Sequence, residues 1–376
     1  MIDITCIYAT ARPSENAMMG RTEDHLTLFL DSLEQQTLKS FEVIIADCYH
    51  KYRTSHISNN TYKGKKYPFK IIHFQVKSPW LDRGCWAGQA PWNQSILLAT
   101  GELLCFFGDC CETIPDYLER IWNWYIKDKW AMGLVIYKKK GKLFYIKEKD
   151  LEESIPDSNT DVWNQGISRN IKILRERGVL KDIVRDSRWP IVESTKNGIL
   201  NLKGQIGGQQ FHGYSCIPLN AILEINGFDE NFDGDKSLGD TDTGLRLALA
   251  GYDRNLLLDK EIIIYENCHY GIPEDLLFYK GLSIRSNYSL MMLNQLKGRF
   301  IANNYHLSNE DVDWICEHGK DWGFKDFNPN ANPHFQWWLD NPPIFDLREL
   351  RWAVQDDLDD GIIKIPSYYG EKLNED

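Results

Sequence analysis

The first 125 residues alternate short apolar segments with segments of helical periodicity, and this order constrains the fold of the chain most strongly. Strands are expected at residues 2–9, 41–46, 69–76 and 103–107, with helices around 26–33, 92–99 and 115–126. Such alternation is typical of a parallel sheet covered by helices. We therefore expect an α/β fold with a mixed sheet flanked by helices.

Polar residues follow three of the expected strands at the point where each strand ends. They are Thr10 to Arg12, Asp47 and Asp109. In open α/β sheets the ligand crevice lies at the carboxyl ends of the strands. These side chains are therefore expected to converge on one crevice.

The remainder of the chain divides into three parts. Residues 138–205 are charged and irregularly patterned, and no function is assigned to them. Order returns at 207–271, with a helix expected at 245–250 and a strand at 261–265. Beyond about residue 290 the chain is rich in Trp and in Asn-Pro breaks. We expect a catalytic domain over 1–290 with a variable insert at 138–205, and a mostly helical, Trp-rich module over 291–376.

Composition excludes some function classes. The 376 residues carry a net charge of -11, which opposes wrapping of a nucleic-acid backbone by the whole protein. The nine cysteines are odd in number and lie mostly in apolar runs, which suits a reducing compartment. The N-terminus enters a strand pattern without a signal-like segment, and no stretch of about 18 uncharged apolar residues follows. We expect a cytoplasmic protein without a transmembrane segment.

Two acidic segments carry candidate chemistry. In residues 105–112 an apolar strand delivers Asp109 into a turn, where a carboxylate is suited to hold the divalent cation that a nucleotide diphosphate requires. In the second, Gly227-Phe228-Asp229-Glu230 is followed by a turn that presents Asp240 and Asp242 just before a helix, whose N-terminus favours negative charge. Glycosyl transfer with inversion needs one carboxylate that accepts the proton of the acceptor hydroxyl. The alternative for Asp109, Asp240 and Asp242 is a turn or capping role. Because Asp240 and Asp242 lie two residues apart, one of them can cap the helix while the other acts in catalysis.

Two further residues extend these segments. His269 follows the strand expected at 261–265 and is suited either to complete a cation site with Asp109 or to a structural hydrogen bond. Tyr214 has an aromatic face of the kind that stacks on sugar rings, although most aromatic residues of the chain belong to the core.

At these residues the chain resembles the family 2 glycosyltransferases of the GT-A (Rossmann-like) fold. Residues 92–109 look like that family's helix, Ala-x-Gly-Glu turn and strand leading into an Asp-x-Asp motif. Residues 227–230 and 239–247 are similar to its Gly-Phe-Asp-Glu and Glu-Asp-x-Asp-x-Gly-x-Arg-Leu segments, as in the galactosyltransferase-like and chondroitin-polymerase-like branches. The resemblance covers about residues 1–290, and the insert matches poorly.

The resemblance implies transfer of a sugar from a nucleotide-sugar, expected to be a UDP-sugar, to a glycan or other hydroxyl acceptor with inversion. Asp240 matches the general base. Asp109 matches the ligand position for Mn²⁺ or Mg²⁺, and His269 falls near the His that some members use as an additional ligand, with Glu112 as the alternative. Tyr214 and Asp242 are expected at the acceptor. The residues that match the donor contacts are Thr10, Arg12, Asp47, Asp82, Arg83, Asn93 and Asp109.

The sequence departs from the family pattern at two positions. Gly108-Asp109-Cys110 keeps only the middle acid of the Asp-x-Asp triplet, and Gly239 replaces the Glu before Asp240. These losses leave open a catalytically weak nucleotide-sugar-binding protein on the same fold. A glycosyltransferase acting on modified DNA is a further alternative, which would need a basic groove in the insert. A nucleotidyltransferase is less favoured because no convincing Gly-rich phosphate loop lies near the N-terminus.

Overall fold

A computed structural model describes most of the chain outside the insert. The described residues are 2–11, 24–85, 87–139, 142–143, 183, 185, 188–202, 214–234, 238–267, 287–318, 333–359 and 363–366. Arg12, His269 and most of the predicted insert lie outside these ranges.

The first sheet has the strand order β11-β6-β1-β2-β5. Its strands are β1 (Ile4–Thr10), β2 (Phe41–Asp47), β5 (Lys70–Gln75), β6 (Leu103–Phe107) and β11 (Cys216–Pro218). The first four run parallel and β11 runs antiparallel to β6. All residues of β2 and β6 are buried, as continuous apolar runs in a covered parallel sheet require. The expected α/β class and mixed sheet are confirmed.

Helices cover this sheet where the periodicity predicted them. They are α2 (His25–Glu34), α4 (Ala90–Leu98) and α5 (Tyr117–Tyr125). Asp24 caps α2 by accepting a hydrogen bond from the Thr27 backbone, and the apolar face of this helix is fully buried. The turn between α4 and β6 passes very close to β1, because a Cβ on Gly101 would lie 2.5 Å from the backbone nitrogen of Thr5. Only glycine allows this approach.

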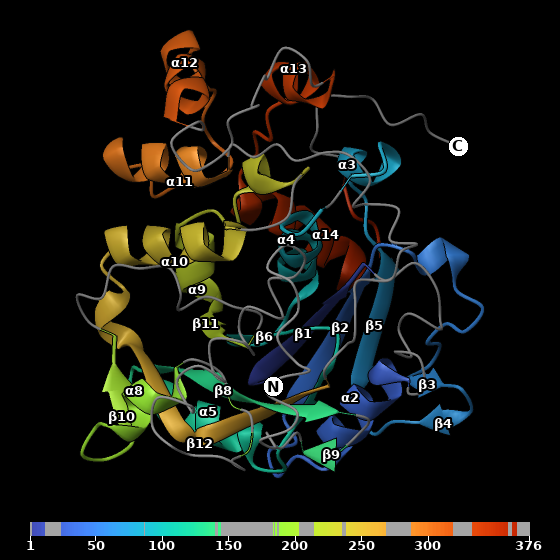
Figure 1. Cartoon of the computed structure of the whole chain (residues 1–376). Coiled ribbons are helices and arrows are strands. Elements are labelled where there is room, and N and C mark those ends of the chain that lie inside the picture. The colour runs from blue at the N-terminus through green and yellow to red at the C-terminus, as the bar shows by residue number, and fades with distance from the viewer. Residues whose placement is uncertain are drawn as a thin grey trace, which may run out of the picture.

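A second sheet lies along the lower edge of the molecule in Figure 1. In it, β12 (Leu256–Asn267) pairs in parallel with β8 (Trp130–Lys139), and β10 (Ile199–Asn201) and β9 (Lys142–Leu143) extend the two edges. The short strand β7 (Cys111–Thr113) also pairs with β12 and follows β6 closely, so it joins the two sheets. β12 is longer than the predicted strand at 261–265. A separate hairpin joins β3 (Thr61–Tyr62) to β4 (Lys65–Lys66).

The helix α10 (Gly239–Leu249) begins six residues before the predicted start at 245. Asp240 and Asp242 therefore lie inside its first turn, and the expectation that they precede the helix is wrong. Leu238 turns the chain in a left-handed conformation with φ of 73° and provides no side-chain cap. The shorter helices in the described ranges are α3 (Pro79–Asp82), α8 (Trp189–Glu193), α9 (Leu219–Glu224), η2 (His50–Tyr52), η3 (Glu230–Phe232) and η4 (Asp253–Asn255).

The C-terminal region is helical, as expected. It contains α11 (Asn287–Leu296), α12 (Asn309–His318), α13 (Pro333–Asp340) and α14 (Leu347–Asp359). In Figure 1, α14 (red) runs beside α4, and Arg351 on α14 donates from Nη1 to the carbonyls of Ile96 and Leu97 at 3.0 Å. The predicted boundary between residues 290 and 291 falls inside α11, and the two-domain division stays a prediction. Within the described ranges, no helix is both long and apolar enough to span a bilayer.

Candidate active site

The ends of β1, β2 and β6 come together as the strand order predicted. Thr10 is the register partner of Asp47, and both are the last residues of their strands. The Thr10 hydroxyl donates to Asp109 Oδ2 at 3.2 Å, and the Tyr8 hydroxyl donates to the Asp109 carbonyl at 2.7 Å. The half-buried Asp109 carboxylate is thus held at the carboxyl edge of the sheet.

Asp47 lies in a buried ion pair. Its two oxygens accept hydrogen bonds from Nε and Nη2 of Arg53, both at 2.8 Å, and from the Tyr49 backbone at 2.9 Å. His73 Nε2 lies 3.2 Å from Oδ2. Burial by itself would raise the pKa of Asp47, but the hydrogen bonds and charges of His73 and Arg53 outweigh it and lower the pKa to about 2. Asp47 is therefore ionised at neutral pH, and its contact with the nucleotide stays a prediction.

Tyr214 fills the space beside Gly108. A Cβ on Gly108 would lie 2.8 Å from the Tyr214 hydroxyl oxygen. That hydroxyl donates to Glu266 Oε2 at 2.8 Å, and burial together with the Glu266 charge raises the pKa of Tyr214 far above its usual range. The position of the missing first acid is thus occupied by a tyrosine that pairs with a buried glutamate. The sequence did not single out Glu266, and the contact of Tyr214 with the acceptor stays a prediction.

The end of β12 lies directly beside the turn that carries Asp109. The Asn267 backbone donates to the Cys110 carbonyl at 2.9 Å, and the Asn267 side chain donates to Glu112 Oε1 at 3.0 Å. Lys138 forms an ion pair with the other oxygen of Glu112 at 3.2 Å. His269 lies two residues beyond Asn267, outside the described residues.

Asn93 joins α4 to the Gly227–Glu230 turn. Its Oδ1 accepts from the Phe228 backbone, and its Nδ2 donates to the Phe228 carbonyl and to Glu230 Oε1, each at 2.8 Å. The side chain is fully buried. Asn93 thus holds the second acidic segment against the first sheet, while its predicted contact with the donor is not tested.

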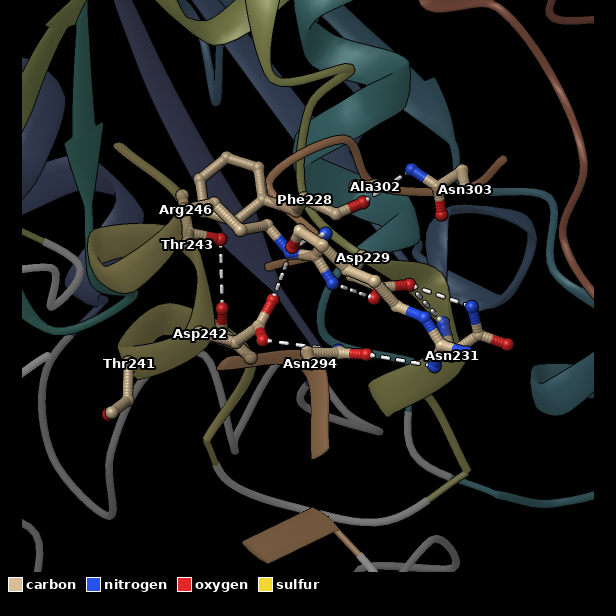
Figure 2. A network of polar contacts seen from close by, with 12 residues as sticks. Phe228, Asp229, Asn231, Thr241, Asp242, Thr243, Arg246, Asn294, Ala302 and Asn303 are labelled. Carbon is tan, nitrogen blue, oxygen red and sulfur yellow. Dashed lines mark hydrogen bonds and ion pairs between the residues drawn. The ribbon is translucent and has the colours of Figure 1, made fainter. Parts of the chain in front are cut away.

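Figure 2 shows a buried polar network that fixes this segment against α10. The Arg246 guanidinium donates to both Asp242 and Asp229, and its Nη1 donates to the Arg299 carbonyl at 2.9 Å. Burial raises the pKa of Asp242 to about 6; Arg246 opposes this rise and the nearby Asp229 charge adds to it. Asp242 therefore has a structural role, because it pairs with Arg246 in the buried network. Its contact with an acceptor stays a prediction.

Asp240 differs from Asp242 in exposure. It is half-buried, and its Oδ1 accepts from the backbone of the adjacent Thr241 at 2.8 Å. The preceding Gly239 abuts the Gln89 side chain, since a Cβ there would lie 2.2 Å from Gln89 Nε2. A larger residue at 239 must displace Gln89. Asp240 is half-buried and Asp242 is buried, so Asp240 is the more accessible acid in the first turn of α10.

The predicted nucleotide loop packs on the C-terminal helices. Asp82 ends α3 and is exposed. Arg83 stacks its guanidinium over Trp337 of α13 at 4.1 Å from the ring centre. The following residues 88–90 donate three backbone hydrogen bonds of 2.7–3.0 Å to the buried carboxylate of Asp233. The donor contacts of Asp82 and Arg83 stay predictions.

Negative charge gathers around the strand ends. Burial raises the pKa of the Cys48 thiol far above its usual value, and the charges of Asp47, Asp233 and Asp109 raise it further. Three carboxylates from distant parts of the sequence therefore act on one buried thiol. None of the eight described cysteines forms a disulfide bond.

Sequence patterns missed a cluster of His50, His56 and His73 beside Asp47. Candidate ligand atoms of the three side chains lie within 4.8 Å of one another, and among the described residues they form a group with the composition of a metal site. Burial, with smaller effects from His73 and His56, lowers the pKa of His50 to about 4. The spacing of the three residues matches no metal-binding motif, so the sequence carried no signal for the cluster.

Comparisons with known proteins give only distant structural similarities. No protein-family model matches the chain, and no curated protein matches it in sequence. Among solved structures, S. aureus TarS residues 1–349 in complex with UDP-GlcNAc is similar, with 12% identity and a TM-score of 0.46 over 90% of this chain and 78% of that one. A structure of S. aureus TarS gives 14% identity and a TM-score of 0.41 over 89% of this chain, which spans 47% of that protein. GalNAc-T7 with UDP, GalNAc and Mn²⁺ gives 9% identity and a TM-score of 0.45, covering 97% of this chain and 58% of that one. All three TM-scores lie below 0.5, so the function is argued below from this chain's own residues.

Proposed function

We propose that the chain is a glycosyltransferase of the GT-A fold that uses a nucleotide-sugar, a UDP-sugar by resemblance to family 2. The observation that carries the proposal is the meeting of Thr10 and Asp109 at the carboxyl edge of a parallel sheet. A crevice at this edge is where α/β sheets bind nucleotides. The donor residues are Thr10, Arg12, Asp47, Asp82, Arg83, Asn93 and Asp109.

A divalent cation, Mn²⁺ or Mg²⁺, fits the Asp109 position. The carboxylate is a hard oxygen ligand that accepts a hydrogen bond from the Thr10 hydroxyl. The backbone hydrogen bond from Asn267 to Cys110 holds the end of β12 beside the turn that carries Asp109, and His269 follows two residues later in the sequence. This short separation supports His269 as a second ligand. When bound, the ion would take up the charge that develops on the leaving diphosphate.

Asp240 acts as the general base in this proposal. It accepts the proton of the acceptor hydroxyl while the hydroxyl oxygen attacks the anomeric carbon, the bond to the diphosphate breaks, and the configuration inverts. Accessibility supports Asp240 over Asp242, because the Asp242 carboxylate is buried against Arg246. Tyr214 and Asp242 are the acceptor-binding residues in this proposal.

The test compares Asp240→Asn with Asp356→Asn, a change of an exposed acid on α14. Release of nucleoside diphosphate from a panel of UDP-sugars is measured with Mn²⁺, with Mg²⁺ and with chelator. We expect Asp240→Asn to lower kcat by about 10²–10⁴-fold while donor binding persists. Asp356→Asn should match the wild type. Wild-type transfer rates in Asp240→Asn would remove the assigned base.

A second candidate is a nucleotide-sugar-binding protein with weak catalysis. Two observations favour it: Tyr214 occupies the space beside Gly108, and Gln89 occupies the space beside Gly239, where the family carries acids. Calorimetric binding of a UDP-sugar with neither transfer nor donor hydrolysis under any metal condition would support this candidate over the enzyme.

A further inference from the structure

Three histidines from separate segments face one another beside the first sheet. His50 begins η2, His56 lies in the loop that follows, and His73 lies on β5. The rings of His50 and His73 meet edge to face with centroids 4.5 Å apart, and those of His56 and His73 lie 6.1 Å apart. We call these residues the histidine cluster.

The spacing inside the histidine cluster is close to that of a metal site. His56 Nδ1 lies 3.2 Å from His50 Nε2. Two nitrogens bound to one tetrahedral Zn²⁺ at about 2.0–2.1 Å lie roughly 3.3 Å apart, so this pair already has the required separation. All three candidate ligand atoms lie within 4.8 Å of one another. Zn²⁺ binding would therefore bring the third nitrogen closer to the other two by at most about 1.5 Å.

His73 has the partner that zinc-binding histidines usually have. Its Nε2 lies 3.2 Å from Asp47 Oδ2, which leaves Nδ1 as the nitrogen for a metal. A carboxylate that accepts the second ring N–H fixes the tautomer and orientation of a metal-binding imidazole. The Ile57 backbone donates a long hydrogen bond of 3.4 Å to Nδ1, which a metal ion at this nitrogen would replace.

The cluster is also open on one side. His56 is exposed while the His73 side chain is buried, so an ion has a path from solvent to the cluster. Imidazole ligands suit Zn²⁺ and its transition-metal neighbours, whereas Mg²⁺ and Mn²⁺ prefer carboxylate and water oxygens. The ligand chemistry therefore differs from that of the Asp109 position.

We propose that the histidine cluster binds one Zn²⁺ through His50, His56 and His73, with water as the fourth ligand. The ion would tie η2 and its following loop to β5. Because Asp47 contacts both His73 and Arg53, the bound ion also fixes the buried pair at the end of β2. This site stands whether or not the chain transfers sugars, since it rests on the imidazole geometry alone.

The test uses the full-length chain without a histidine tag, stripped of metal by chelator. Zn²⁺ is titrated by calorimetry in competition with a chromophoric chelator, and Co²⁺ is added separately as a spectroscopic probe. The wild type should bind one equivalent of Zn²⁺ and give the intense visible bands of a four-coordinate Co²⁺ site. His56→Gln removes an exposed ligand, so the variant should fold normally. It should weaken Zn²⁺ binding at least about tenfold and lose the Co²⁺ bands.

Two controls separate this site from others. His306→Gln removes an exposed histidine outside the cluster and should bind Zn²⁺ as the wild type does. Asp109→Asn should also keep Zn²⁺ binding, so failure of the proposed donor site leaves this result unaffected. Equal Zn²⁺ affinity in wild type and His56→Gln, or no Zn²⁺ binding by the wild type, would overturn the proposal.

Discussion

Arg246 offers the sharpest test of how the second acidic segment is held. Its side chain is 1% exposed and lies between the carboxylates of Asp229 and Asp242, whose side chains are no more than 2% exposed. Arg246→Met keeps the approximate length of the side chain but removes the charge and five N–H donors. Two buried carboxylates then face each other without their cation.

The magnitude follows from the burial of these groups. Removing one partner of a buried ion pair costs about 3–5 kcal/mol, because the remaining charge is left uncompensated. If the 376 residues unfold as one unit, roughly 2.1 cal/mol/K per residue gives an unfolding entropy of about 0.8 kcal/mol/K, so Tm should fall by about 4–6 °C.

The loss of stability in Arg246→Met should grow with pH. Burial already raises the pKa of Asp242 to about 6, and without Arg246 this pKa rises further above the unfolded value. A raised carboxyl pKa favours the folded state below the unfolded pKa, and this contribution is lost as pH rises.

The assay is urea denaturation and thermal melting of wild type and Arg246→Met at about pH 5 and pH 8. A triple variant, Asp229→Asn with Asp242→Asn and Arg246→Met, neutralises all three groups. It should lose less stability than Arg246→Met alone, since none of these three buried charges remains. A loss below about 1 kcal/mol in Arg246→Met, or strict additivity in the triple variant, would refute the reasoning.

Three other predictions concern separate parts of the molecule. The Asp47 pKa of about 2 against an unfolded value near 3.9 contributes roughly 2–3 kcal/mol above pH 4. This stability is lost as pH falls toward 2, and Asp47→Asn should lack this acid limb in denaturation profiles. Gly108→Ala should cost about 1–3 kcal/mol by pressing on Tyr214, and Tyr214→Phe in the same chain should recover part of the loss in thermal melts. Asn226→Ala removes three hydrogen bonds to residues 302, 345 and 347, so the C-terminal helices should become more sensitive to limited proteolysis.

The N-terminal half of the fold was predictable because its signals are local. The apolar run 103–107 is bounded as predicted, and the repeat of Leu26, Phe29, Leu30 and Leu33 identified the buried face of α2. The meeting of Thr10 with Asp109 followed from strand order alone. The start of α10 was misjudged, because Leu238 begins the helix through a left-handed backbone conformation and without a side-chain cap.

The sequence by itself determined the order of strands and helices, the carboxylates at the strand ends and the two acidic segments. Those features depend on the periodicity and composition of neighbouring residues. Only the tertiary structure decided which acid of Asp240 and Asp242 is buried, because that depends on Arg246 and on Asp229 from a distant turn. It also brought together His50, His56 and His73, which meet through the parallel pairing of β2 with β5. Contacts across paired strands leave no spacing signal along the chain, so they are visible only in the folded protein.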